Sequence, residues 1–134
     1  MKNSKKIIIV EDDPDINNLI AYNLRKASFN VEQVFDGLSA EQKLSNEYFD
    51  IVILDIMLPG IDGFDICRNL KENPFNGRNF IIMISAKSSQ KDQLYAHILG
   101  ADAYLTKPFS VAALMDIVKE VNQMQSQDFV VTHK

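Results

Sequence analysis

Five short apolar runs recur along the chain, and longer stretches with helical spacing separate them. The runs are mostly unbroken by polar residues, which is typical of strands buried on both faces of a parallel sheet. They predict strands at 7–10, 31–35, 51–55, 80–84 and 103–105. The second run is more polar than the others, so we expect its strand near an edge of the sheet.

Between the runs, apolar residues recur at intervals of three and four, as on one face of a helix. They predict helices at 14–26, 39–46, 63–72, 89–99 and from residue 110 to about 124. Side chains that accept hydrogen bonds at helix starts precede most of them. The predicted caps are Asp13, Asp62, Ser89 and Ser110 at helix starts and Gly100 at the end of the fourth helix.

Strand and helix alternate five times, with connections that suit crossover pairing of parallel strands. Such crossovers are almost always right-handed, which places helices on both faces of the sheet. The predicted fold is therefore α/β and doubly wound. A chain of 134 residues makes one ordinary domain. We expect it to cover 5–122, with 123–134 as a C-terminal tail or the end of the last helix.

Polar side chains follow four of the five predicted strands. The first strand is followed by Glu11 and Asp12, the third ends in Asp55, the fourth is followed by Ser85, and Lys107 follows the fifth. An isolated aspartate after a strand is most often a cap or a turn residue. In an open parallel sheet, however, all these strand ends lie at one edge, where ligands bind. We therefore expect the five side chains to converge.

Three clustered carboxylates repel one another unless a cation or a proton intervenes. Oxygen ligands without His or Cys favour Mg²⁺ or Ca²⁺ over zinc, and Mg²⁺ leaves coordination sites for phosphate oxygens. A lysine can neutralise one phosphoryl oxygen and a hydroxyl can bind another. With Lys107 and Ser85 nearby, Asp55 has the surroundings that formation of an aspartyl phosphate requires.

Composition narrows the range of partners and locations. The formal net charge of −4 argues against direct nucleic-acid binding, which depends on neutralising phosphates. Cys67 is the single cysteine and lies at helical spacing with core residues, so we expect it to be a buried thiol. No apolar run is long enough to span a membrane, and we expect a cytoplasmic location.

Four segments, in order, resemble the receiver domains of two-component response regulators. They are VEDD at 10–13, LDIMLPGIDG at 54–63, ISAK at 84–87 and GADAYLTKPF at 100–109. Each motif is weak by itself, but together they are highly specific, and the resemblance extends from 5 to about 122. It implies a flavodoxin-like fold with strand order 2-1-3-4-5.

The resemblance also implies roles at the site. Asp55 is expected to take a phosphoryl group from a phosphohistidine on a sensor histidine kinase or a histidine phosphotransfer protein. Asp55 and Asp12 would bind Mg²⁺ directly, Glu11 through water, and Met57 through its backbone carbonyl. The chain would then be a signalling switch that takes part in its own phosphorylation and dephosphorylation, rather than an enzyme.

For the switch, the resemblance implies that Ser85 turns toward the phosphoryl group and that Tyr104 turns inward. Lys107 occupies the family's lysine position, and the bond to Pro108 is often cis in the family. A downstream protein or output domain would read the altered surface. Pairing of two copies after phosphorylation is a further expectation.

Two other protein classes fit these residues less well. A Mg²⁺-dependent aspartyl-phosphate phosphohydrolase needs an acid two residues after its nucleophile, where this chain has Met57. A flavin carrier would not place Glu11, Asp12 and Asp13 next to a phosphate. The Met1 start and an ending unlike a linker favour a stand-alone single-domain regulator. The alternative is the receiver part of a DNA-binding transcriptional regulator, because 100–109 resembles receivers joined to winged-helix domains.

Overall fold

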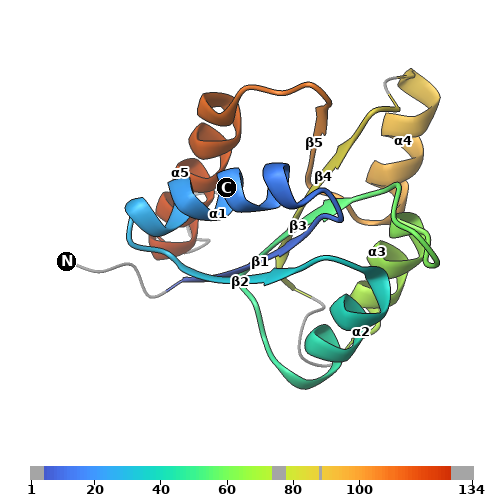
Figure 1. The fold of residues 1–134 in the computed structure, drawn as a ribbon, viewed down its shortest axis with the longest axis horizontal. Helices are drawn as coiled ribbons and strands as arrows, with labels where there is room; N and C mark the ends of the chain where they lie inside the picture. The colour runs from blue at the N-terminus through green and yellow to red at the C-terminus, as the bar shows by residue number, and fades with distance from the viewer. Residues whose placement is uncertain (1–4, 74–77, 88, 128–134) are drawn as a thin grey trace.

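The structure is a computed structural model that describes residues 5–73, 78–87 and 89–127. Its strands and helices alternate along the described chain (Figure 1). The strands are β1 (Lys6–Val10), β2 (Asn30–Val34), β3 (Ile51–Asp55), β4 (Phe80–Ser85) and β5 (Ala103–Thr106). The helices are α1 (Pro14–Lys26), α2 (Gly37–Asn46), α3 (Gly63–Lys71), α4 (Gln90–Leu99) and α5 (Val111–Gln127).

All neighbouring strands pair in parallel, in the order β2-β1-β3-β4-β5. The prediction of a doubly wound, flavodoxin-like α/β fold with this order is confirmed. The expectation that the polar second strand lies at an edge is also confirmed. β3 runs through the middle of the sheet, where Ile53 lies opposite Ile9 of β1 and Ile82 of β4. Asp55 is thus held at the end of the central strand.

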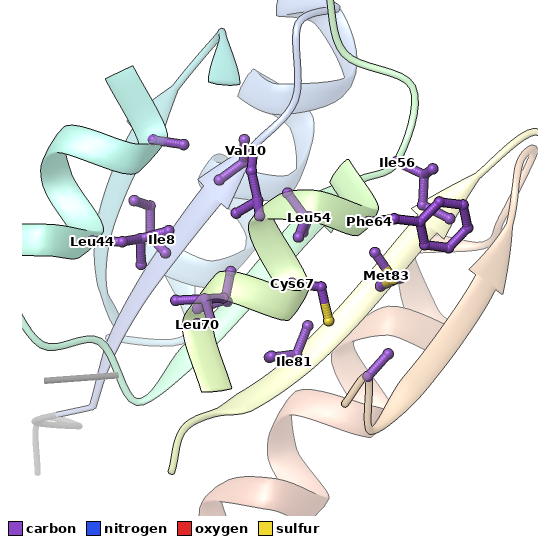
Figure 2. Packing of buried hydrophobic residues seen from close by; sticks show 14 of the residues in the cluster. Ile8, Val10, Leu44, Leu54, Ile56, Phe64, Cys67, Leu70, Ile81 and Met83 are labelled. Atoms are coloured by element: carbon purple, nitrogen blue, oxygen red, sulfur yellow. The ribbon is translucent and has the colours of Figure 1, made fainter. Parts of the chain in front are cut away.

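Alternate side chains of the strands pack into two separate layers of core. Side chains of one face, such as Ile8 and Leu54, pack with residues of α2 and α3 (Figure 2). The same core includes Ala96 of α4. Those of the other face, such as Ile9 and Ile53, pack with α1 and α5. These four side chains are fully buried, and burying each contributes about 1.5–3 kcal/mol. This two-sided burial makes the central strands a firm support for the residues at their ends.

The helix ends bear out the capping predictions. At the helix starts the capping side chains accept from backbone N–H groups two or three residues further on, as Asp13, Asp62, Ser89 and Ser110 do. Gly100 closes α4 with a φ of 117°, in the left-handed region that favours glycine. Cys67 is fully buried, as predicted.

Some boundaries and exposures differ from the sequence expectation. Helix α2 begins at Gly37 rather than at residue 39, because the carboxylate of Asp36 caps it by accepting from Ser39 N at 2.7 Å. The apolar pattern located α4, but the structure buries Ala96 and leaves Leu94 and Ile98 exposed. Helix α5 continues to Gln127, and 128–134 lies outside the described residues. Among the described helices, none is both long and apolar enough to cross a membrane.

Candidate functional site

The acidic residues at the ends of β1 and β3 lie together, as the strand order requires. Each of Glu11, Asp12 and Asp55 offers a carboxylate oxygen, and these oxygens lie within 4.8 Å of one another. Glu11 and Asp55 are buried, whereas Asp12 is exposed. The cluster is therefore anchored in the protein on one side and open to solvent on the other.

Lys107 enters the same cluster from the end of β5. Its Nζ lies 2.8 Å from Glu11 Oε1 and 3.0 Å from Asp55 Oδ2. Its backbone N–H donates to Ser85 O at 2.7 Å, and the peptide bond to Pro108 is cis. Burial lowers the pKa of the ammonium group, but the contacts with Glu11 and Asp55 outweigh it, so the net pKa is raised. Lys107 thus stays charged between two carboxylates.

Glu11 has the most unusual electrostatic surroundings of the cluster. Burial raises the pKa of its carboxyl group to about 7, against the lowering effect of Lys107 and of the Asp13 N–H. Oε2 accepts from Asp13 N at 3.0 Å. Oε1 meets the Lys107 ammonium but has no well-directed hydrogen bond from any residue that the structure describes. A buried carboxylate oxygen that lacks a directed hydrogen bond is stabilised when a further cation binds beside it.

The backbone around Asp55 fixes its carboxylate. Met57 N donates to Asp55 Oδ1 at 3.0 Å, while Oδ2 faces Lys107. The following residue, Ile56, donates to Ile84 O of β4 and accepts from Gly63 N of α3 at 2.9 Å. Strand and helix therefore both hold the loop. The Met57 side chain is exposed, and the loop lines a hollow of about 490 Å³ that Asp12 also borders.

Ser85 and Tyr104 meet through the backbone of Lys87. Ser85 is fully buried, and its hydroxyl accepts from Lys87 N at 3.0 Å. The Tyr104 hydroxyl donates to Lys87 O at 2.7 Å. Burial raises the pKa of Tyr104. Both side chains therefore contact the β4–α4 loop.

The donor set fits a hard divalent cation. Glu11, Asp12 and Asp55 contribute carboxylate oxygens, and Mg²⁺ is bound in proteins by one or two such groups together with waters. Zinc sites use mainly thiolate and imidazole ligands, which this cluster does not contain. The predicted ligand Met57 lies in the adjoining loop and lines the same hollow as Asp12.

One buried polar residue near the site was not singled out from the sequence. Asn17 is fully buried in α1 and donates from its amide to Glu11 O and Val34 O, both at 2.9 Å. The signal was present, because Asn17 shares helical spacing with the buried Ile20, Ala21 and Leu24. A polar residue in such an apolar stripe needs hydrogen-bond partners inside the protein.

The comparison with protein families decides what kind of domain this is. A family model described as the response regulator receiver domain matches residues 7–119. The chain belongs to this family. As a receiver domain it is part of two-component signalling, where such domains act as switches between a histidine kinase and an output partner.

The relatives of this receiver include a transcriptional regulator. The phosphate regulon transcriptional regulatory protein PhoB of Rhizobium meliloti (strain 1021) is 40% identical over 114 residues. That match covers 85% of this chain and 50% of the relative, so the receiver spans about half the length of PhoB.

Solved structures share the fold closely. A CheY-like receiver domain protein from Methanospirillum hungatei is 26% identical, with a TM-score of 0.86 over 93% of this chain and 98% of its own. The receiver domain of the sensor histidine kinase PA1611 from Pseudomonas aeruginosa is 29% identical. Its TM-score is 0.81 over 91% of this chain and 100% of its own, and it has a magnesium ion coordinated in its active site cleft.

Proposed function

We propose that Asp55 accepts a phosphoryl group from a kinase phosphohistidine in a Mg²⁺-dependent reaction. The observation that supports this most strongly is the position of its carboxylate, which lies at the end of the central strand beside Lys107 and the other two carboxylates. A nucleophile, a fixed cation and a metal-binding donor set are thereby combined at one edge of the sheet. Phosphoryl transfer depends chiefly on such positioning and charge stabilisation.

In the proposed reaction an oxygen of Asp55 attacks phosphorus in line as the phosphorus–nitrogen bond of the phosphohistidine breaks. Met57 N–H and the Lys107 ammonium hold the two carboxylate oxygens in place before attack. Glu11 and Asp12, with Asp55 and the Met57 carbonyl, would hold Mg²⁺, which supplies further stabilisation of charge on the phosphoryl oxygens. Lys107 then neutralises part of the charge that the phosphoryl group brings.

The proposed switch uses the contacts at the β4–α4 loop. Ser85 gives up the N–H of Lys87 and donates its own hydroxyl proton to a phosphoryl oxygen. The loop then moves, and Tyr104 loses its hydrogen bond to Lys87 O and turns inward. This is a population shift between two packings, biased by a local charge. An inert beryllofluoride mimic should shift the amide NMR signals of Ser85, Tyr104 and the α4–α5 face; shifts confined to residues beside Asp55 would contradict it.

The proposed partners are a sensor histidine kinase or a histidine phosphotransfer protein on the input side. We place this phosphoryl transfer in the cytoplasm, where a reducing environment suits the single buried thiol Cys67. On the output side, a stand-alone regulator would dock on a separate protein when phosphorylated, and two copies would pair. The domain itself does not bind nucleic acid, in keeping with its net charge of −4.

A second output mode is favoured by one observation. PhoB is a transcriptional regulatory protein, and this receiver spans only half of it. In this alternative the receiver controls a DNA-binding domain in the same polypeptide. The reading frame of the gene distinguishes the two modes: a frame that continues past Lys134 into a further domain supports the second.

The experiment for the proposed function measures phosphoryl uptake. The chain is incubated with acetyl phosphate and Mg²⁺, and its mass is followed over time. We expect wild type and the control Asp62→Asn to gain one phosphoryl group, because Asp62 caps α3 outside the cluster. Asp55→Asn should gain none. Equal uptake by Asp55→Asn and wild type would refute the assignment.

A further inference from the structure

Asn17 joins three segments that meet beside the acidic cluster. It lies in the first turn of α1, where its backbone N–H donates to Asp13 O at 2.9 Å. Its side-chain amide bridges the carbonyls of Glu11, at the end of β1, and Val34, at the end of β2. Val34 O also accepts from Glu11 N at 3.2 Å. Glu11 is thus held to Asn17 and β2 through both its N–H and its carbonyl.

The orientation of the Asn17 amide is set by a chain of hydrogen bonds that ends at an arginine. Arg25 can only donate, and its Nη1 lies 2.9 Å from Gln33 Oε1. Gln33 Nε2 therefore points the other way, and it donates to Asn17 Oδ1 at 2.9 Å and to Asn18 Oδ1 at 2.8 Å. The Asn17 NH₂ group is left to face the two carbonyls. Donor and acceptor types agree at each step, so the opposite amide orientation would break several bonds at once.

We propose that Asn17 is a positioning residue for the cation site. By fixing the backbone of Glu11 it fixes the direction in which Glu11 and the next residue, Asp12, present their carboxylates. Asn17 touches neither the phosphoryl group nor the metal. It acts through the β1–α1 loop, as residues behind the metal ligands commonly do. This inference rests on the proposed Mg²⁺-dependent function and adds a residue to it.

The alternative is that Asn17 only donates hydrogen bonds to two buried carbonyls and so contributes to stability. The two roles predict different results. A stabilising residue changes the free energy of unfolding but not the Mg²⁺ affinity of the folded molecules. A positioning residue changes that affinity, because the carboxylates must hold their relative placement to share one small cation.

The test compares Asn17→Leu with Asp50→Ala. The control removes a similar contact from the opposite end of the same strand, where the Asp50 carboxylate accepts from Lys6 N at 2.8 Å. Mg²⁺ dissociation constants are measured by amide NMR titration of each folded variant, and stability by urea unfolding. We expect Asn17→Leu to raise the Mg²⁺ Kd by about tenfold or more, the usual effect of losing a group that orients a metal ligand. Asp50→Ala should leave the Kd close to that of wild type.

Two further measurements cover the remaining outcomes. If Asn17→Leu does not fold, Gln33→Ala takes its place, because it removes the partner that orients the amide from a half-buried position. It should raise the Kd in the same direction by a smaller factor. Hydrogen exchange of the Glu11 and Asp13 amides in metal-free protein should be faster in Asn17→Leu than its loss of stability explains. The Glu11 amide donates to Val34 O, which Asn17 also contacts, and the Asp13 amide donates to the Glu11 side chain.

The outcomes separate this inference from the proposed function. Failure of the wild-type chain to bind Mg²⁺ overturns the cation site and this inference with it, whereas phosphoryl uptake still tests Asp55 separately. A normal Mg²⁺ Kd in Asn17→Leu overturns the inference, whatever the exchange rates, and leaves Asp55 phosphorylation untouched.

Discussion

Helix α3 begins directly against the backbone that carries Asp55, and Gly63 is the residue that permits this approach. A Cβ atom at Gly63 would lie 2.5 Å from Ile56 Cα, 2.6 Å from Asp55 O and 2.9 Å from Ile56 O. All three neighbours are backbone atoms, so none can rotate away. Gly63→Ala should therefore push α3 and the β3–α3 loop apart, which displaces the phosphoacceptor as well as destabilising the fold.

The expected cost follows from three contributions. Carbon atoms in contact prefer roughly 3.5–4.0 Å, so the loop and helix must separate by about 1 Å. Overpacking of this kind costs about 1–3 kcal/mol, and weakening the bond from Gly63 N to Ile56 O adds about 0.5–1.5 kcal/mol. The higher helix propensity of alanine offsets at most about 1 kcal/mol of this destabilisation. The net loss should be about 0.5–4.5 kcal/mol.

The assay pairs stability with phosphoryl uptake and uses Gly100→Ala as the control. Gly100 has a φ of 117°, and a Cβ there would meet only the flexible side chain of Lys71 among its nearest neighbours, far along the chain from Asp55. Its strain costs a similar amount, about 1–3 kcal/mol. At matched stability, Gly63→Ala should take up phosphate about 100-fold more slowly, as a displacement of 1 Å can cause. Equal uptake rates in the two variants, or a Gly63→Ala as stable as wild type, would refute the reasoning.

Three other predictions concern charge at the site. Lys107→Ala should increase Mg²⁺ affinity severalfold in an NMR titration, because the ammonium no longer competes for the Glu11 and Asp55 carboxylates; weaker binding would contradict this. Asp12→Ala should weaken Mg²⁺ binding by about tenfold or more, since loss of one charge beside a divalent ion exceeds about 1.4 kcal/mol; an unchanged titration would move the metal site elsewhere. In metal-free protein, Glu11 has a pKa of about 7 when folded and an ordinary value of 4.5 when unfolded. The protonated form of Glu11 therefore stabilises the fold, and this contribution is fully present below pH 4.5. In urea unfolding, the free energy of unfolding should fall by up to about 3 kcal/mol as the pH rises from 4.5 to 7. Glu11→Gln should not show this fall.

Much of the fold could be predicted because its signals are local. Unbroken apolar runs located the buried strands, and capping residues such as Asp13 and Ser89 located the helix starts. The close approach of the residues at the strand ends could be predicted, because a parallel sheet places all those ends at one edge. The convergence of Glu11, Asp12, Asp55 and Lys107 therefore followed from topology, without knowledge of any side-chain position.

The remaining features depend on side-chain contacts between segments distant in sequence. The spacing of Leu94 and Ile98 indicates a helix, but which side of α4 is buried depends on how the helix leans against its neighbours, and Ala96 makes the close contact. Asn17 stands at a core position of α1, yet its partners lie on β1 and β2. A hydrogen-bond network of this kind has no periodicity to reveal it.

The identity of the phosphorylated residue is the central claim, and chemical trapping tests it most directly. An aspartyl phosphate is an acyl phosphate, which borohydride reduces to an alcohol, so the modified residue can be located by peptide mass spectrometry. After incubation with a phosphorylated histidine kinase and Mg²⁺, we predict the reduced residue at Asp55 and at no other carboxylate. Recovery of the reduced residue at Asp12, or of a phosphorylated chain with Asp55 unmodified, would contradict the proposed function.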